Sequence, residues 1–515
     1  MIRFSNLNRR FGNRRCQLLA ALFALYLAAP GRAWAVDPAP PPQEPQIAAA
    51  SNEGQQALQG FKLPAGWQRQ LFAAEPQLAN PVAFCIDGVG RVFVCETFRQ
   101  SKGVEDNRGR DYWLNDDLAA QTVDDRVAYV KKHLKEKAKE FVQHDDRVRL
   151  LVDRDGDGQA DEATVFAKHF NRMSDGTGAG VLFHRGSVYY TCIPDLWKLT
   201  DTNRDGVADE RTSLHFGYGV RYAFRGHDLH GLIVGPDGKI YFSLGDRGYN
   251  VVSEGRRWKN PECGAVFRCD PDGSNLEVFA YGLRNPQELA FDDYGNLFTG
   301  DNNSDSGDQA RWVYVMEGGD TGWRMSYQYL PDRGPFNREK IWHPANAEQP
   351  AYVAPPIRNL GSGPSGLAFY PGTGLGDHFR QRFFLCDFRG GPGGSGIRTF
   401  RVKPKGAFFE VVDEEFSITN VLATDVDFGP DGAVYVSDWV DGWNGLNKGR
   451  IHRFFDPEQA KSPQVRQVKE LLAADLTSRV PGAVAPLLGH ADRRVRQAAQ
   501  FAPVSYTHLT LPTKA

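Results

Sequence analysis

The feature that most constrains the fold is an internal repeat of paired apolar strands. Each copy joins an apolar segment to an apolar-aromatic segment, and the chain contains six copies. The pairs are 82–84 with 92–94, 180–183 with 188–190, 232–234 with 240–242, 289–291 with 297–298, 367–369 with 383–385, and 426–428 with 434–436. A third segment of alternating character follows each pair, at 148–151, 196–199, 266–268, 312–315, 397–400 and 451–454. A unit of three or four strands repeated radially is typical of a β-propeller, whose closed ring protects the strand edges.

We therefore expect an all-β fold, a six-bladed β-propeller, over residues 61–456. A β-sandwich, the competing all-β fold, would not repeat this motif six times. One insertion interrupts the first repeat, since residues 123–142 have the apolar periodicity of a helix among many charges. The insertion lies between the second and third strands of that repeat, so we expect it to cover one face of the propeller.

The two ends of the chain differ in character from the repeats. Residues 1–35 have a basic stretch, a short apolar run and an Ala-Trp-Ala site, which is typical of a cleaved signal peptide. We therefore expect an exported protein of the periplasm or cell envelope; an uncleaved anchor, which would make it membrane-associated, is the alternative. Residues 36–60 are rich in Pro, Ala and Gln and are expected to be a linker.

After the last repeat the sequence becomes helical. Residues 457–503 resemble the start of HEAT-like repeats, and a single repeat cannot bury its apolar face alone. We therefore expect this region to be truncated. Residues 504–515 have no helical pattern and resemble a translated sequencing adapter, so we interpret them as an artefactual tail.

Charge and cysteine content narrow the functional classes. The net charge of -2 argues against a nucleic-acid partner. Without its signal peptide the chain keeps six cysteines, an even number that permits disulfides in an oxidising compartment but does not pair them. The sequence has no C-x-x-C zinc spacing and no C-x-x-C-H haem attachment.

The candidate catalytic residues fall between residues 226 and 323. His227 precedes one strand and Asp246 follows the next strand of the same hairpin, so both are expected at the same end of a blade. Arg284 comes from the equivalent end of the following blade. A base, a carboxylate that orients it and a cation would thus meet near the propeller axis, as oxidation of an alcohol requires. The alternative is that these are turn residues that satisfy backbone groups.

His230 is a rival for the base, because it lies three residues from His227. Strand alternation predicts that the two imidazoles point to opposite sides.

The same segment contains four motifs: Gly226-His227-Asp228-Leu229-His230-Gly231, Leu244-Gly245-Asp246-Arg247-Gly248, Arg284-Asn285-Pro286-Gln287 and Gly319-Asp320-Thr321-Gly322-Trp323. With them it resembles the soluble glucose dehydrogenase and sorbosone dehydrogenase family, six-bladed propellers that use pyrroloquinoline quinone (PQQ) and calcium. The order of signal, propeller and helical repeats also resembles bacterial "membrane-bound dehydrogenase" propeller proteins, which often end in a c-type cytochrome. The resemblance implies a sugar or alcohol substrate and a c-type cytochrome or other electron acceptor.

Site residues follow from this resemblance. It implies that His227 takes the substrate hydroxyl proton, that Asp246 orients His227 and that Arg284 lies near the quinone carbonyl. Asn285 and Arg389 are implied as further cofactor-binding residues.

The resemblance also implies a calcium ion bound to the quinone. Gly300 matches a backbone calcium ligand of the family. Asp301 stands where the family has proline, a departure that could add a carboxylate ligand or change the site.

A second motif points to calcium independently of that resemblance. Oxygen-bearing side chains recur at positions 1, 3, 5 and 9 of two loops, with Gly at position 6, as in calcium-binding loops. The residues are Asp153, Asp155, Asp157 and Asp161 in the first loop and Asp201, Asn203, Asp205 and Asp209 in the second. Neither loop has Glu at position 12, and a pair of solvated Asp-Gly turns is the alternative.

Three functions are compatible with these observations. The first is a PQQ-dependent dehydrogenase that oxidises a sugar or alcohol by hydride transfer. The second is a calcium-dependent propeller hydrolase of the lactonase type, and the third is a non-catalytic propeller that binds carbohydrate or protein. The fold does not decide among substrates, because the loops of the pocket do.

Overall fold

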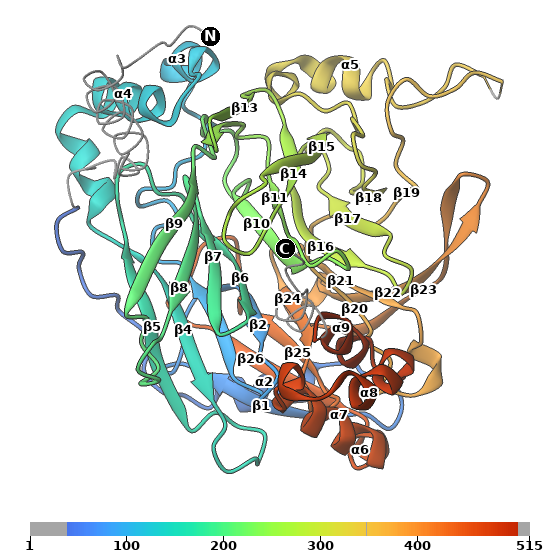
Figure 1. Ribbon diagram of the computed structural model, residues 1–515. Helices are drawn as coiled ribbons and strands as arrows, with labels where there is room; N and C mark the ends of the chain where they lie inside the picture. Colours follow the sequence, from blue (N-terminus) through green and yellow to red (C-terminus); the bar gives the residue numbers. More distant parts are fainter. Residues whose placement is uncertain (1–38, 347, 503–515) are drawn as a thin grey trace, which may run out of the picture. The chain divides into compact units, whose positions relative to one another are not determined.

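Six four-stranded antiparallel sheets, the blades, follow one another along the chain in the computed structural model (Figure 1). The structure describes residues 39–346 and 348–502, so the predicted signal peptide and the tail at 504–515 lie outside it. Residues from Pro41 onward form one unit.

The strands of the first three blades are arranged in chain order from the axis outward. Blade one has β2 (Pro81–Ile86), β3 (Val92–Glu96), β4 (Asp146–Val152) and β5 (Glu162–Phe170). Blade two has β6 (Gly178–His184), β7 (Ser187–Cys192), β8 (Asp195–Thr200) and β9 (Glu210–Phe216). Blade three has β10 (Leu229–Val234), β11 (Ile240–Leu244), β14 (Gly264–Cys269) and β15 (Glu277–Leu283), and a separate hairpin of β12 (Tyr249–Ser253) and β13 (Arg256–Asn260).

The other three blades complete the ring. Blade four has β16 (Pro286–Phe291), β17 (Leu297–Asp301), β18 (Arg311–Tyr314) and β19 (Arg358–Asn359). Blade five has β20 (Pro364–Phe369), β21 (Phe383–Asp387), β22 (Gly396–Lys405) and β23 (Phe408–Thr419). Blade six has β24 (Ala423–Phe428), β25 (Val434–Asp438), β26 (Arg450–Phe455) and β1 (Gln68–Ala74). The innermost strands β2, β6, β10, β16, β20 and β24 contact one another in sequence, and β24 contacts β2. The expected six-bladed propeller is confirmed.

The ring is closed by the first strand of the chain. β1 pairs antiparallel with β26 and becomes the outer strand of blade six, whose other three strands come from residues 423–455. Phe72 of β1 is buried and packs edge-on against Tyr435 of β25, with ring centroids 5.3 Å apart. The closing contact therefore buries apolar surface as well as pairing a strand edge.

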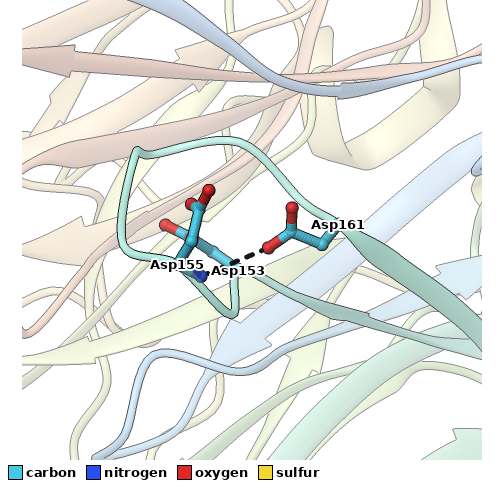
Figure 2. A group of neighbouring side chains, drawn as sticks. All are labelled: Asp153, Asp155 and Asp161. Atoms are coloured by element: carbon cyan, nitrogen blue, oxygen red, sulfur yellow. Dashed lines mark hydrogen bonds between the residues drawn. The ribbon is translucent and has the colours of Figure 1, made fainter.

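The two Asp-rich loops connect the third and fourth strands of blades one and two. In the first, Asp153 accepts hydrogen bonds from the backbone N–H groups of Gly156 (2.7 Å) and Gly158 (2.9 Å). Oxygens of Asp153, Asp155 and Asp161 lie within 4.8 Å of one another (Figure 2). These carboxylates could therefore share one cation.

The second loop repeats the backbone geometry of the first. Asp201 accepts from the N–H groups of Arg204 (2.6 Å) and Gly206 (3.0 Å). Its Asn203 amide donates to Asp205 and Asp209, both at 3.1 Å. Calcium binding by the two loops stays a prediction.

Each Asp-rich loop also contacts the outer strand of the preceding blade. The N–H of Ala160 donates to the carbonyl of Phe72 on β1 (2.8 Å), and that of Ala208 donates to the carbonyl of Phe166 on β5 (2.9 Å). The two alanines occupy the same position of the two loops. A cation that ordered these loops would therefore hold neighbouring blades together, and in the first loop it would support the closing strand.

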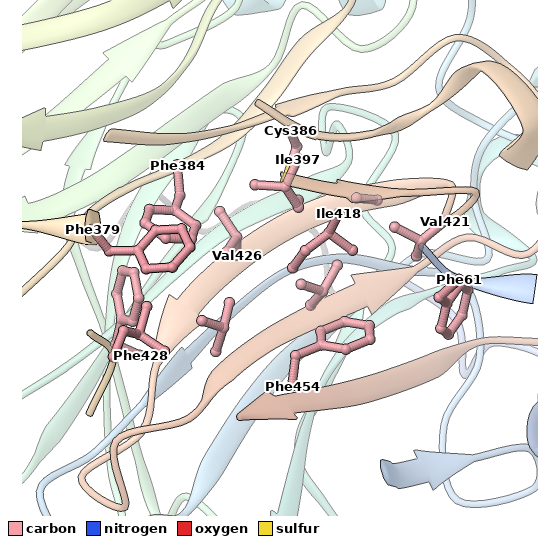
Figure 3. Packing of buried hydrophobic residues seen from close by; sticks show 14 of the residues in the cluster. Phe61, Phe379, Phe384, Cys386, Ile397, Ile418, Val421, Val426, Phe428 and Phe454 are labelled. Atoms are coloured by element: carbon pink, nitrogen blue, oxygen red, sulfur yellow. The ribbon is translucent and has the colours of Figure 1, made fainter. Parts of the chain in front are cut away.

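The strands are apolar over consecutive residues because each blade is buried on both faces. On β21, Phe384 and Cys386 pack against blade six, in the cluster drawn in Figure 3. Phe383 and Leu385 point the opposite way and pack against blade four. Successive side chains of a strand point to opposite faces, so a blade between two others requires an unbroken apolar run.

The insertion in blade one covers the face of the propeller that carries the loop before β10. It comprises α3 (Leu114–Ala119), α4 (Val123–Leu134) and a 3-10 turn over Lys135–Val142. The side chain of Thr122 caps α4 by accepting from the N–H of Asp125 (3.1 Å). Asp117 accepts from the N–H of Tyr222 (3.0 Å), in the segment that leads to His227. The expected helical insertion over one face is thus present.

The remaining helices lie at both ends of the molecule (Figure 1). They are α2 (Glu53–Ala57), α5 (Gly334–Asn337), α6 (Pro457–Ala460), α7 (Pro463–Ala473), α8 (Pro481–Val484) and α9 (Arg493–Phe501). On α9, Gln500 donates to the carbonyl of Pro236 in blade three (2.7 Å) and Arg494 donates to that of Phe428 in blade six (2.6 Å). A cavity of about 1060 Å³ lies between these last helices and the innermost strands. The HEAT-like assignment of this region stays a prediction.

The sequence predicts that the described residues lack a membrane span, and it leaves their cysteines available for pairing. None of the described helices has the length and hydropathy needed to cross a membrane. Cys85, Cys95, Cys192, Cys263, Cys269 and Cys386 are all buried and unpaired.

Because β1 closes the ring, we expect a core substitution in this strand to lower the stability of the protein strongly. Phe72→Ala should lower the free energy of unfolding by about 3–5 kcal/mol, because it leaves a cavity where β1 packs on blade six. Urea unfolding followed by tryptophan fluorescence would measure it. Tyr294→Ala is the control, since Tyr294 is 81% exposed and its loss should change stability by less than about 0.5 kcal/mol. Equal stability of the two variants would contradict this role of β1.

The Asp-rich loops predict a response to chelation. EGTA should lower the melting temperature of the folded protein, because a ligand at about 100 times its Kd stabilises by about 2.7 kcal/mol. Combining Asp155→Ala with Asn203→Ala should remove most of this response. Asp272→Ala, in the equivalent turn of blade three, is the control and should preserve it. If EGTA changes neither the melting temperature nor the metal content, the loops are ordinary turns.

Candidate active site

His227 and Asp246 lie at the end of the blade-three hairpin, where the sequence predicts them. Nδ1 of His227 is 2.7 Å from Oδ1 of Asp246, and the histidine is 3% exposed. Leu229 pairs with Leu244, and the N–H of Gly245 donates to the carbonyl of Asp228 (3.0 Å), which brings His227 and Asp246 opposite each other. A carboxylate only accepts hydrogen bonds, so Nδ1 carries the proton, and in the neutral ring Nε2 then has a free lone pair. Nε2 has no hydrogen bond to any residue that the structure describes.

Asp246 is held by two further donors. Its Oδ2 accepts from Nε1 of Trp323 (2.7 Å) and from Nε2 of Gln328 (2.8 Å). Both donors come from the long connection between β18 and β19 of blade four. Three donors converge on this buried carboxylate, so its orientation relative to His227 is fixed.

Arg284 joins the same network from the junction of blades three and four. Its Nη2 donates to Oε1 of Gln328 (3.3 Å) and to Oδ2 of Asp305 (2.9 Å), and its carbonyl accepts from the N–H of Asp246 (2.8 Å). Arg284 is almost completely buried, and this burial lowers its pKa from the usual arginine value. The structure thus brings His227, Asp246 and Arg284 together.

Sequence reasoning missed two members of this network. Trp323 ends the motif at 319–323, but the motif predicts no role for its side chain. Gln328 belongs to no motif, and it reaches Asp246 across 82 residues. No local pattern reports a contact of that separation.

His230 lies in a different environment from His227, and the alternation of the two rings stays a prediction. Its Nε2 lies 3.1 Å from the N–H of Asp228, and its Nδ1 lies 3.3 Å from the carbonyl of Ala179. Burial lowers the pKa of His230, which favours the neutral ring. Since both nitrogens have main-chain partners, His230 has a structural role here.

All six blades deviate from regular pairing near the start of the innermost strand. In blade three the deviation falls between His230 and Ile233. Such bulges increase twist and re-aim side chains, and they are frequent next to active sites.

The carboxylate of Asp301, a predicted metal ligand, already accepts hydrogen bonds from protein groups. Its carboxylate accepts from the N–H groups of Arg284 (3.1 Å) and Asn285 (2.7 Å) and forms an ion pair with Arg311 of β18. Gly300 precedes it on β17, and an added Cβ there would lie 2.6 Å from Pro364, so this strand end packs tightly against blade five.

The same arrangement recurs in two other blades. Glu96 at the end of β3 accepts from the N–H of Ala79 (2.8 Å) and pairs with Arg149 of β4. Asp387 at the end of β21 accepts from the N–H of Ser362 (2.9 Å) and pairs with Arg398 of β22. An acid at this point of a blade ties the second strand to the third, which gives Asp301 a structural role that competes with metal binding.

Of the residues predicted to bind the cofactor, Arg284 and Asn285 are buried with polar atoms unpaired among the described residues, whereas Arg389 is partly exposed and paired. Nε of Arg284 and Oδ1 of Asn285 are buried and have no hydrogen-bond partner among the described residues. Such unpaired groups are costly unless a ligand or water satisfies them. Arg389 is 38% exposed and is paired with Asp387 (2.7 Å), and no described contact joins it to the network of His227. The cavity beneath α9 includes none of these residues.

The chain is similar to known quinone-dependent propellers. It is 28% identical over 136 residues to quinoprotein glucose dehydrogenase B of Acinetobacter calcoaceticus, a match of 21% of this chain and 28% of that protein. The chain thus spans 28% of the length of this curated relative. The expected resemblance to PQQ-dependent glucose dehydrogenases is confirmed.

The chain is also similar to several solved structures at low sequence identity. An oxidoreductase (glucose dehydrogenase) of Thermus thermophilus is 18% identical with a TM-score of 0.46, over 76% of this chain and 100% of that one. The PQQ-bound aldose sugar dehydrogenase of Streptomyces coelicolor is 14% identical with a TM-score of 0.43, over 76% and 100%. The PQQ domain of pyranose dehydrogenase of Coprinopsis cinerea is 12% identical with a TM-score of 0.46, over 81% and 99%. The six-bladed architecture rests on the strand pairing described above.

A family match covers most of the propeller. Residues 53–443 match the family described as Domain of unknown function (DUF7133), from α2 to the loop after β25. The chain therefore belongs to the DUF7133 family.

Proposed function

We propose that this protein is a quinone-dependent oxidoreductase that oxidises a hydroxyl group of a sugar or alcohol. The observation that carries the proposal is the pair of His227 and Asp246, 2.7 Å apart, with Nε2 of the histidine free of partners among the described residues. The similarity to quinoprotein glucose dehydrogenase B supports the reaction class.

His227 acts as the general base in this proposal. Nε2 accepts the proton of the substrate hydroxyl, because Nδ1 is already protonated and donates to Asp246. Asp246 stabilises the imidazolium that results, and Trp323 and Gln328 keep the carboxylate aligned. The pair needs no rearrangement during the proton transfer.

Arg284 and Asn285 are the residues that fit a cofactor. Each has a buried polar atom that lacks a partner among the described residues, and Arg284 brings a cation to the network. When bound, PQQ would supply the hydride acceptor and Ca²⁺ would supply Lewis-acid assistance. Asp301, the carboxylate predicted to hold that ion, is paired with Arg311. Arg284 would interact with the electronegative edge of such a group, and Gln328 and Asp305 would hold the guanidinium in place. The proposed electron acceptor is a c-type cytochrome or another carrier.

Reconstitution tests the proposal directly. The purified chain, supplied with PQQ and Ca²⁺, should acquire quinone absorbance and reduce a redox dye with a sugar or alcohol from a screening panel. Absence of quinone uptake, together with turnover of a lactone without any electron acceptor, would favour the hydrolase instead. Absence of both activities would leave a binding propeller.

The identity of the base predicts a contrast between two histidines. His227→Ala should reconstitute with PQQ nearly as well as the unmodified protein but lose roughly 10²–10⁴ in turnover, the usual contribution of a general base. His230→Ala should retain turnover and lower the melting temperature, since its ring satisfies buried main-chain groups. Dye reduction and quinone absorbance would be measured on both. Loss of turnover in His230→Ala alone would reverse the assignment, and activity in both variants would exclude the mechanism.

The hydrogen bonds that hold His227 and Asp246 predict that substitutions in this network reduce turnover by different amounts. Asp246→Asn should reduce turnover by about 10²–10⁴, because it misorients the imidazole. Trp323→Phe should reduce it less, on the order of 10- to 100-fold, as expected for one hydrogen bond to a charged group. Trp342→Phe is the matched control: Trp342 lies in the same cluster, and its indole nitrogen has no partner among the described residues. Steady-state kinetics across pH would check the series, and equal losses in Trp323→Phe and Trp342→Phe would contradict it.

A further inference from the structure

An exposed tryptophan stands on the face of the propeller that carries His227. Trp443 lies in the loop between β25 and β26 and is 60% exposed. A tryptophan ring offers a large, rigid apolar surface with one polar edge, and tryptophan is enriched among the residues that contribute most to binding.

The ring of Trp443 is held in place rather than mobile on the surface. The ring of Phe388 meets it at a centroid distance of 5.2 Å and an angle of 63°. The backbone of Gly390 lies against the indole so closely that an added Cβ would be 2.4 Å from Nε1. The N–H of Gly442 donates to the carbonyl of Gly390 (3.1 Å), which joins the loops of blades five and six. A fixed aromatic surface loses little entropy when a ligand stacks on it.

Polar residues lie close to Trp443 in the sequence of these two loops. Asp441 and Asn444 flank the tryptophan in sequence and are exposed, and Arg389 lies between Phe388 and Gly390. An aromatic ring on loops that also carry an amide, a carboxylate and a guanidinium suits an amphipathic ligand, whose apolar face stacks while its hydroxyls form hydrogen bonds. A pyranose ring has this character.

The surface is connected to the candidate active site. Oδ1 of Asn444 accepts from Nη1 of Arg225 at 3.0 Å, and Arg225 lies two residues before His227. The N–H of Gly445 also donates to Gln100 of blade one (3.3 Å). The loop of Trp443 therefore borders the segment that carries the base.

We propose that Trp443 forms an outer saccharide subsite, on which a sugar ring linked to the reacting sugar stacks. The substrate would then be an oligosaccharide or a glycoside rather than a free monosaccharide. This inference rests on the proposed function, whose reacting hydroxyl would lie at His227.

Calorimetry with defined saccharides tests the subsite without relying on catalysis. The full chain would be titrated with maltotriose, cellotriose and xylotriose and with the monomers glucose and xylose. At least one trisaccharide should bind more tightly than its monomer. Trp443→Ala should weaken that trisaccharide on the order of tenfold, as expected for loss of an aromatic stacking partner, and should leave monomer binding unchanged.

Companion variants separate stacking from folding. Trp443→Phe should retain most of the affinity because it keeps a flat ring. Trp443→Leu should not, although it keeps apolar contact with Phe388. Tyr294→Ala is the matched control, since Tyr294 is an exposed aromatic in the β16–β17 turn at the other end of the blades.

Each outcome decides the inference. Equal trisaccharide affinity in Trp443→Ala or Trp443→Leu and the unmodified protein would overturn it, and so would the absence of trisaccharide binding. Trisaccharide binding lost in Trp443→Leu, in a protein that oxidises no sugar after reconstitution, would support the subsite and reject the proposed function. Oxidation of monosaccharides, with trisaccharide binding unchanged in the Trp443 variants, would support the proposed function and reject the subsite.

Discussion

The pairing of β1 with β26 is the constraint on which the rest of the structure depends. Blade six obtains its outer strand from the start of the ring, so the sheet edge of β26 is covered only when residues about 380 positions apart come together. Phe72 and Tyr435 then share one buried cluster with strands of blades one and six. Closure converts six separate sheets into one ring, because each blade needs neighbours on both faces to bury its apolar side chains.

The ring explains why the chemistry lies where it does. A closed set of blades fixes the strand ends, and the loops that leave them meet near the axis. His227, Asp246 and Arg284 all come from such ends, in blade three and at its junction with blade four. The loop that carries Trp323 and Gln328 then folds back over Asp246. Rigid strands thus position the base, while a long connection buries and aligns its carboxylate.

Repetition among blades separates architecture from chemistry. The acid at the end of the second strand recurs as Glu96, Asp301 and Asp387, each with a basic partner on the third strand. A residue that repeats in this way is explained by blade construction. The pair of His227 and Asp246 has no counterpart in these three blades, whereas blade six contains another buried histidine–aspartate pair, with Nε2 of His452 on β26 at 3.0 Å from Asp438 at the end of β25.

The sequence alone determined the number of blades, the third strand of each and the helical insertion, because burial of both faces imposes apolar runs that recur with the repeat. It also identified His227 and Asp246, since neighbouring strands of one hairpin place their ends together. Only the tertiary structure decided the rest. It recruited Trp323 and Gln328 to Asp246, gave Asp301 donors from its own blade and placed Asn444 beside Arg225 across 219 residues. The reason is physical: contacts between distant loops depend on how the ring closes, and closure leaves no periodic pattern in the residues that it brings together.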